Sequence, residues 1–275
     1  MCESCGCSGP DGGYKIFKPG EKFETQGFVS NNTNQIEVSH THSHEHGHSH
    51  DHPHDHNHSN TSHSISIEQD ILGTNNLLAE RNRGYFEAKE IFALNLVSSP
   101  GSGKTSLLVK TIEETKNVFK SYVIEGDQQT DNDARRISST GAEVLQINTG
   151  NGCHLDSQMV HEALQQLKPI EKSVVFIENV GNLVCPALFD LGEKKRVVIF
   201  STTEGEDKPL KYPNMFNTSS LCIINKTDLL PYLDFNIELA KQNVLKVNPT
   251  ATIIELSVKN GEGFGKWVDW IKKNM

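Results

Sequence analysis

Apolar and polar positions follow two different patterns along the chain, and the change lies near residue 76. Beyond it, a helical pattern over residues 77–89 leads into apolar runs of strand length, which alternate with helical stretches. The runs that predict buried strands are residues 91–97, 122–125, 144–147, 174–178, 197–202, 221–224 and 253–256. Strands that are apolar on both faces and alternate with helices predict an α/β fold, with a mostly parallel sheet flanked by helices on both faces.

Residues 1–76 show little apolar periodicity, and Gly, Ser, Asn, Thr and His dominate them. Such a composition buries too little apolar surface to offset chain entropy, which predicts a disordered tail rather than a second fold. We therefore expect a tail over residues 1–76 and one folded domain over residues 77–275. The hydrophobic fraction of 35% is lowered by this tail and not by a poor core.

A glycine-rich loop follows the first predicted strand directly. Residues 98–105 read Ser-Ser-Pro-Gly-Ser-Gly-Lys-Thr, and a helical pattern continues to residue 116. Gly101 and Gly103 let successive N–H groups point into one anion-sized hollow at the positive end of that helix. This context predicts a phosphate-binding loop, although Ser98 stands where the usual pattern begins with Gly.

The residues of this loop divide the phosphate chemistry between them. Lys104 supplies a charge for the β- and γ-phosphates, and Thr105 supplies a hydroxyl for Mg²⁺. The candidate phosphate contacts are Gly101, Ser102, Gly103, Lys104, Thr105 and Ser106.

The choice of base is indicated farther along the chain. The run 221–224 leads into Asn225-Lys226-Thr227-Asp228, the arrangement with which P-loop GTPases recognise guanine. The Asp228 carboxylate would accept from N1–H and the exocyclic amine, which adenine does not offer in that geometry. By itself the segment also fits an ordinary polar turn. A third segment, Ser257-Val258-Lys259, resembles the Ser-Ala-Lys loop at the guanine edge, so the three signals together predict GTP.

Acidic residues close two further strands at the same predicted edge of the sheet. Asp127 is the first candidate for the Mg²⁺ sphere, and Glu178 is its companion. The alternative is that either acid caps a helix or a turn. With Lys104 they make up the candidate catalytic set, and because no general base is identifiable we expect a slow, regulatory GTP hydrolysis.

Cysteine and histidine supply the metal signals. Cys2, Cys5 and Cys7 lie within the first seven residues, and three thiolates with the nearby N-terminal amine suit Ni²⁺ more than Zn²⁺. A histidine tract follows, whose neutral imidazoles predict weak binding of several ions, as in storage; a solvated spacer is the alternative. Its members are His40, His42, His44, His46, His48, His50, His52, His54, His56, His58 and His63.

A third candidate metal site joins Cys153, His154 and Cys185. By spacing alone, these fit buried structural cysteines better than ligands. Their segments are nevertheless continuous with loops that would feel the γ-phosphate, so a Ni²⁺ or Zn²⁺ site here would be coupled to the nucleotide.

Charge and composition exclude several partners. The net charge is −9 without a Lys/Arg cluster, so we expect neither nucleic acid nor an anionic membrane as a partner. No apolar stretch approaches the length of a membrane span, and the first 30 residues do not read as a secretory signal. We expect a cytoplasmic protein whose cysteines are thiols or metal ligands.

Four segments and the N-terminal Cys-x-x-Cys-Gly-Cys resemble the hydrogenase nickel-incorporation GTPases, the HypB family of the SIMIBI class. The segments are VIEGDQQT at 123–130, NTGNGCHLD at 148–156, FIENVGNLVCP at 176–186 and EGEDKPLKYP at 204–213. The resemblance covers the chain from about residue 77 to its end. It implies delivery of nickel to the large subunit of [NiFe]-hydrogenase, driven by GTP hydrolysis, with a HypA-type chaperone as partner.

The resemblance also implies roles for individual residues. Cys2, Cys5 and Cys7 would form a tight nickel site, and the Cys153 group would bind Ni²⁺ or Zn²⁺ at a homodimer interface promoted by GTP. Lys208 would reach the guanine across that dimer.

Two other functions stay open. One is a nickel storage or detoxification protein with a vestigial GTPase core, which the intact nucleotide motifs disfavour. The other is a urease-type nickel GTPase, from which the cysteine motifs point away.

Overall fold

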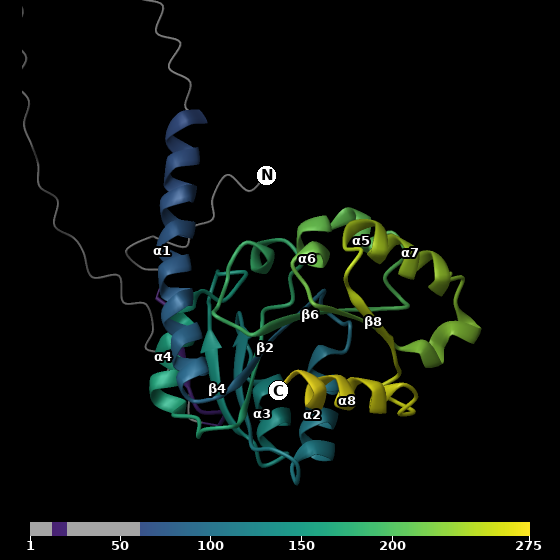
Figure 1. Ribbon diagram of the computed structural model, residues 1–275, viewed down its shortest axis with the longest axis horizontal. Coiled ribbons are helices and arrows are strands. Elements are labelled where there is room, and N and C mark those ends of the chain that lie inside the picture. Colours follow the sequence, from purple (N-terminus) through teal and green to yellow (C-terminus); the bar gives the residue numbers. More distant parts are fainter. Residues whose placement is uncertain (1–12, 21–60) are drawn as a thin grey trace, which may run out of the picture.

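The computed structural model describes residues 13–20 and 61–275, with side chains from residue 70 onward in the second range. These residues form one eight-stranded sheet in the order β1-β4-β3-β5-β2-β6-β7-β8 (Figure 1). The strands are β1 (Lys15–Phe17), β2 (Phe92–Ser98), β3 (Ser121–Asp127), β4 (Glu143–Asn148), β5 (Val174–Glu178), β6 (Lys195–Ser201), β7 (Leu221–Asn225) and β8 (Thr252–Glu255). Neighbouring strands from β2 to β8 are parallel, and β1 pairs antiparallel with β4.

Helices cover both faces of this sheet. They are α1 (Thr61–Ala88), α2 (Lys104–Thr115), α3 (Asn132–Ser138), α4 (Ser157–Leu167), α5 (Lys208–Lys211), α6 (Pro213–Asn217), α7 (Ile237–Val247) and α8 (Phe264–Asn274), with the 3₁₀ turns η1 (Cys185–Ala187) and η2 (Thr227–Tyr232). Successive strand residues face opposite sides: Leu94 and Leu96 pack with α2, α3 and α8, whereas Ala93 packs with α1 and α4. The α/β fold with a mostly parallel, doubly covered sheet is confirmed.

All seven predicted strands are present as β2 to β8, but two elements enter the predicted tail. β1 adds a three-residue strand at the edge of the sheet, and α1 begins at Thr61 rather than at residue 77. The prediction of a structureless segment over residues 1–76 is corrected at these two places. A strand this short shows no alternation, and the early part of α1 is too polar to show an apolar stripe.

The second half of α1 is fixed to the start of α4 and to the segment between β5 and β6. The Asn82 amide donates to the carbonyl oxygens of Ser157, at 2.9 Å, and Leu191, at 3.1 Å. The Arg83 guanidinium donates to Asp190 Oδ2 at 2.6 Å. The first half of α1 extends away from the sheet (Figure 1). Within the described part of the chain, no helix is both long enough and apolar enough to cross a bilayer.

Candidate nucleotide and metal sites

The glycine-rich loop joins β2 to α2 at the edge formed by the carboxyl ends of the parallel strands. Gly101 and Gly103 have φ angles of 75° and 94°, a region that favours glycine. A Cβ on Gly103 would also collide with the Asn225 side chain. Ser98 is buried as the last residue of β2, and its hydroxyl donates to the Ser99 carbonyl at 2.9 Å. Ser98 therefore fits at the first loop position, because the sharp turns occur at the two glycines.

The loop borders a cavity of about 560 Å³. Its lining comes from residues 98–106 together with Glu125, Gly126, Asp127, Gln128, Asp133, Arg136, Glu178, Val180, Gly181 and Lys226. The predicted phosphate contacts, Lys104, Asp127 and Glu178 are thus brought together around one hollow, as expected from the position of the loops at one sheet edge.

Lys104 and Thr105 begin α2 and point toward acidic partners. The Lys104 ammonium donates to the Asn179 carbonyl and lies 3.8 Å from Glu178 Oε1. The Thr105 hydroxyl lies 2.6 Å from Glu178 Oε1 and 2.9 Å from Asp133 Oδ2, so it can donate to either. A phosphate would replace the present partners of the Lys104 ammonium. A cation bound to that phosphate would be held by the Thr105 hydroxyl and the carboxylates beside it.

Glu125 and Glu178 fit a cation at this position. Each carboxyl is 2% exposed and leaves its Oε2 atom without a hydrogen-bond partner. Burial, together with the Glu178 and Asp127 carboxylates, raises the pKa of Glu125 to about 9. Burial likewise raises the pKa of Glu178, against the opposing effect of Lys104. These two carboxylate oxygens lie next to the Thr105 hydroxyl and have no hydrogen-bond partner, and oxygen atoms of this kind are the ligands that Mg²⁺ prefers.

Asp127 lies in the cavity lining but also holds a turn. Its Oδ1 atom accepts from the N–H groups of Gln129 at 2.8 Å and Thr130 at 3.1 Å. The structure therefore shows the turn-capping role that the sequence left open. A role for Asp127 in the Mg²⁺ sphere stays a prediction.

Sequence reasoning missed four residues of this site. Glu125 and Asp133 line the cavity, and Arg136 donates to Ser106 Oγ at 3.1 Å and to Asp133 Oδ1 at 2.9 Å. Glu204 accepts from the Ser99 hydroxyl. Glu125 stood in the quoted segment 123–130, whereas Asp133 and Arg136 acquire their positions only when α3 packs beside α2.

The predicted guanine residues are tied to the phosphate loop. The Asn225 amide donates to the Ser102 carbonyl at 2.8 Å, and the Lys226 ammonium donates to the Gly101 carbonyl at 2.7 Å. Lys226 has a φ of 64°, which turns the chain sharply after β7. The segment thus does more than end a strand, because it fixes the loop that would hold the phosphates.

The second guanine segment contacts the first. The Ser257 hydroxyl donates to Asp228 Oδ1 at 2.6 Å, and the Val258 N–H points to Asn225 Oδ1 at 3.4 Å. Lys259 is exposed beside them. The structure therefore brings together Asn225, Lys226, Asp228, Ser257 and Val258 as the sequence predicted.

Lys208 lies near the phosphate loop of its own chain. Its ammonium is 3.4 Å from Glu204 Oε2, and the same carboxylate accepts from Ser99. A role for Lys208 at a guanine across a dimer stays a prediction.

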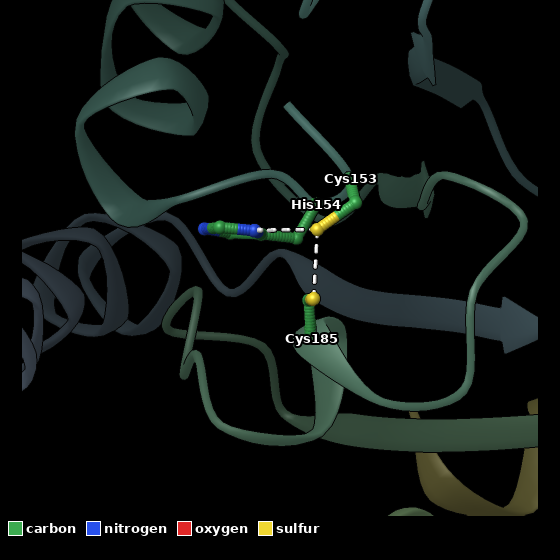
Figure 2. Close-up of side chains that lie close together, drawn as sticks. All are labelled: Cys153, His154 and Cys185. Carbon is green, nitrogen blue, oxygen red and sulfur yellow. Dashed lines mark hydrogen bonds between the residues drawn. The ribbon is translucent and has the colours of Figure 1, made fainter. Parts of the chain in front are cut away.

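Cys153, His154 and Cys185 form the candidate metal centre (Figure 2). Cys153 and His154 lie between β4 and α4, and Cys185 begins η1 after β5. One donor atom from each residue lies within 4.8 Å of the other two, and the two sulfur atoms are 2.7 Å apart. That separation exceeds the S–S bond length of about 2.05 Å, so the pair is not a disulfide. Two thiols and an imidazole are donors that suit Ni²⁺ or Zn²⁺.

The surroundings of His154 favour a neutral ligand. The imidazole is buried and stacks on the Phe189 ring with centroids 3.9 Å apart. Burial lowers the pKa of His154, which keeps the ring unprotonated near neutral pH. Of the other predicted metal ligands, Cys2, Cys5, Cys7, the ten histidines from His40 to His58 and the His63 side chain lie outside the described residues.

Comparisons with known proteins agree with this geometry. Residues 92–255 match the CobW/HypB/UreG nucleotide-binding domain. The chain is 58% identical to hydrogenase maturation factor HypB of Azotobacter vinelandii over 209 aligned residues. The aligned region covers 76% of this chain and 69% of the relative. It is 54% identical to HypB of Escherichia coli K12 over 208 residues, covering 76% and 72%.

Two solved structures have the same fold. HypB from Archaeoglobus fulgidus superposes with a TM-score of 0.69 at 38% identity, covering 73% of this chain and 98% of that one. HypB from Helicobacter pylori, solved in complex with nickel, superposes with a TM-score of 0.68 at 36% identity, covering 73% and 94%. The chain therefore belongs to the HypB family of hydrogenase maturation factors, within the CobW/HypB/UreG nucleotide-binding domains.

Proposed function

We propose that the chain is a GTP-hydrolysing nickel metallochaperone that delivers Ni²⁺ to the large subunit of [NiFe]-hydrogenase. One observation carries the proposal: Cys153, His154 and Cys185 converge on loops that leave the nucleotide-binding edge of the sheet. Membership of the HypB family and the nickel complex of the Helicobacter pylori relative support it.

The nucleotide chemistry follows from the cavity. The N–H groups after Gly101 would bind the phosphates, and Lys104 would exchange the Asn179 carbonyl for the β- and γ-phosphate oxygens. A bound Mg²⁺ supplies charge neutralisation for the transferred phosphoryl group, and Thr105, Glu178, Glu125 and Asp127 are the residues that would hold it or its water ligands. Among the described side chains that line the cavity, none is placed as an obvious base, which supports a slow, regulatory hydrolysis.

The metal centre adjoins the cavity through the loop after β4. The Gln128 amide donates to the Gly152 carbonyl at 3.2 Å, and the Thr149 N–H donates to the Asp127 carbonyl at 2.9 Å. A change around the γ-phosphate would therefore reach Gly152, the residue before Cys153, directly through the first bond. Through the second it would reach Thr149, whose carbonyl accepts from the Gly152 N–H at 2.8 Å. We expect GTP to promote a homodimer in which this centre tightens and hydrolysis to loosen it, with Lys208 contacting the guanine of the partner.

Further parts of the proposal rest on the family and the sequence. A HypA-type chaperone would receive or supply nickel, and Zn²⁺ would compete for the Cys153 centre. Cys2, Cys5 and Cys7 would hold one Ni²⁺ tightly, and the histidine tract would store several ions. We expect all of this in the cytoplasm, with neither nucleic acid nor a membrane as partner.

Titration of the metal-free full chain with Ni²⁺, in the presence of GDP or of a nonhydrolysable GTP analogue, tests the proposal. Cys185→Ala should lose one nickel-binding event and its influence on GTP turnover, yet keep nucleotide binding. Cys222→Ala is the matched control, because that thiol is buried in β7 away from the site. Equal nickel affinity in both nucleotide states would contradict the delivery cycle and leave the storage function, in which the GTPase core is vestigial.

A further inference from the structure

A chain of buried polar side chains begins beside Lys104, at Asn179. Asn179 follows β5 and is fully buried. Its backbone carbonyl accepts from the Lys104 ammonium, and its side-chain Oδ1 accepts from the Leu155 N–H at 3.2 Å. Leu155 is the residue after His154, so one side chain connects the phosphate-binding lysine to one arm of the metal centre.

The same side chain starts a second branch through the interior. The Asn179 amide points to Asn95 Oδ1 at 3.4 Å, and the Asn95 amide donates to Glu193 Oε1 at 3.1 Å. Glu193 Oε1 also accepts from the Arg196 guanidinium, 2.9 Å from its NH2 group. We call Asn179, Asn95, Glu193 and Arg196 the polar relay.

The second branch ends at the other arm of the metal centre. Arg196 donates to the carbonyl oxygens of Ala187 at 3.2 Å and Phe189 at 2.8 Å. Ala187 closes the turn that Cys185 begins, and Phe189 stacks on His154. Both branches therefore end at segments that position the three donors, although Asn95, Glu193 and Arg196 neither line the phosphate cavity nor belong to the donor set.

A core role alone does not require this arrangement. Buried polar groups need partners, and replacing a whole buried ionic group by apolar residues is often neutral for stability. The polar relay instead starts at the one carbonyl that Lys104 must leave when it turns to a phosphate. The peptide that carries this carbonyl also donates its Val180 N–H to Asn179 Oδ1 at 3.0 Å, so a shift of the peptide when Lys104 leaves would act on the side chain that begins both branches.

We propose that Asn179 and Asn95 are positioning residues through which nucleotide at Lys104 and metal at Cys153, His154 and Cys185 change each other's affinity. This rests on the proposed function, since it needs the Cys153 centre to bind metal. By linkage, nickel must alter nucleotide affinity by the same factor as nucleotide alters nickel affinity, typically about 5- to 150-fold.

The test measures the affinity of the full chain for a nonhydrolysable GTP analogue with and without Ni²⁺. The ratio of the two constants is the coupling, and Cys185→Ala reports what other nickel sites contribute to it. Asn95→Ala cuts only the branch to Cys185, so the coupling should fall at least about threefold. Asn179→Ala cuts both branches but keeps the carbonyl that faces Lys104, so the coupling should fall below that of Asn95→Ala. Any coupling left above the Cys185→Ala level is the share carried by the contact between Gln128 and Gly152.

Asn248→Ala is the matched control, because this buried asparagine lies at the end of α7 and its partners belong to neither site. Its amide donates to backbone carbonyls at the end of α6, and its Oδ1 accepts from the N–H and hydroxyl of Thr250. This variant should keep the parental coupling. Nickel stoichiometry should stay unchanged in both relay variants, which separates lost coupling from lost binding. Parental coupling in a folded Asn95→Ala or Asn179→Ala protein would overturn the inference, as would an equal loss in Asn248→Ala. A parent without any coupling, or one whose nickel binding does not depend on Cys185, would instead refute the proposed function.

Discussion

Glu125 and Glu178 are register partners on the neighbouring parallel strands β3 and β5, both buried at the phosphate-binding edge of the sheet. Each carboxyl raises the free energy of ionising its neighbour, because two negative charges would lie side by side away from water. A cation between them removes that cost. We therefore predict a neutral Glu125 in the metal-free protein and an ionised one if Mg²⁺ binds here with the nucleotide.

This relationship predicts the pH dependence of stability in the metal-free chain. The pKa of Glu125 is about 9 in the fold against an ordinary value of 4.5, so the folded state holds a proton that the unfolded state has lost. Stability should fall as pH rises through this window, by at most about 1.4 kcal/mol per pH unit. Glu125→Gln should remove this slope and weaken Mg²⁺-dependent GTP binding, as measured by urea unfolding from pH 6 to pH 9 and by nucleotide titration. Glu143→Gln, at an exposed surface pair, should leave the slope as it is.

Gly103→Ala should weaken GTP binding. The φ of 94° and the collision of a Cβ with the Asn225 side chain oppose the substitution from two directions. Strain of this type costs about 1–3 kcal/mol, which corresponds to about a 5- to 150-fold loss of affinity if the loop shifts to relieve it. Gly84→Ala in α1 has open space around it and should leave GTP affinity unchanged. Fluorescent-nucleotide titration compares the two, and equal affinities would show that this glycine does not shape the site.

Asp228→Asn should exchange guanine for xanthine. The new amide meets the C2 carbonyl of xanthine, whereas the carboxylate meets the N1–H and amine of guanine. A polar pair of this kind decides on the order of 10⁴ in selectivity. Ser257→Ala removes only the hydroxyl that donates to Asp228. It should therefore also lower the affinity for GTP, but by less than Asp228→Asn does. Competition between GTP and xanthosine triphosphate measures both variants, and undiminished GTP affinity in Asp228→Asn would leave residues 225–228 as a structural turn.

Deletion of residues 40–60 should reduce the number of nickel ions bound while preserving GTP hydrolysis. The deletion stops before Thr61 because α1 begins there. The lost ions should be those that the intact chain releases as pH falls through about 6.5, the ordinary pKa of histidine. A tight ion with a thiolate-to-nickel absorption band should remain on Cys2, Cys5 and Cys7. Loss of GTP turnover in this variant would contradict an independent storage tail.

The central strands could be predicted because burial on both faces produces continuous apolar runs, as in residues 174–178. The phosphate loop and the guanine segment could be predicted because each follows such a run directly and carries residue types that its ligand requires. The edge strand β1 and the start of α1 could not, since neither has an apolar pattern to report. The sequence named Cys153 and Cys185 as members of one candidate metal site, but their spacing of 32 positions fitted buried structural cysteines better, and only the fold brings their sulfur atoms to 2.7 Å.

The missed acids show a second limit of sequence reasoning. Glu125 and Asp127 lie two positions apart, so they share one face of β3 and compete for the same assignment. Asp127 has the more familiar position at the strand end, yet Glu125 is the one opposite Glu178. Burial and strand register make Glu125 the partner of Glu178, and neither can be read from a single sequence, whereas a Mg²⁺ role for Asp127 stays a prediction.

Because α1 is attached to the segment after η1, a small rotation of the attached part would move the start of the helix over a longer distance. Asn82 and Arg83 hold it to Leu191 and Asp190, a few residues beyond Cys185, while its first turns stand free of the sheet in Figure 1. About 21 Å of helix separates Thr61 from Asn75, the first side chain of α1 that is buried among those described. A tilt of about 10° about Asn75 would move Thr61 by about 4 Å, so a small displacement beside Cys185 would produce a much larger one at the start of α1.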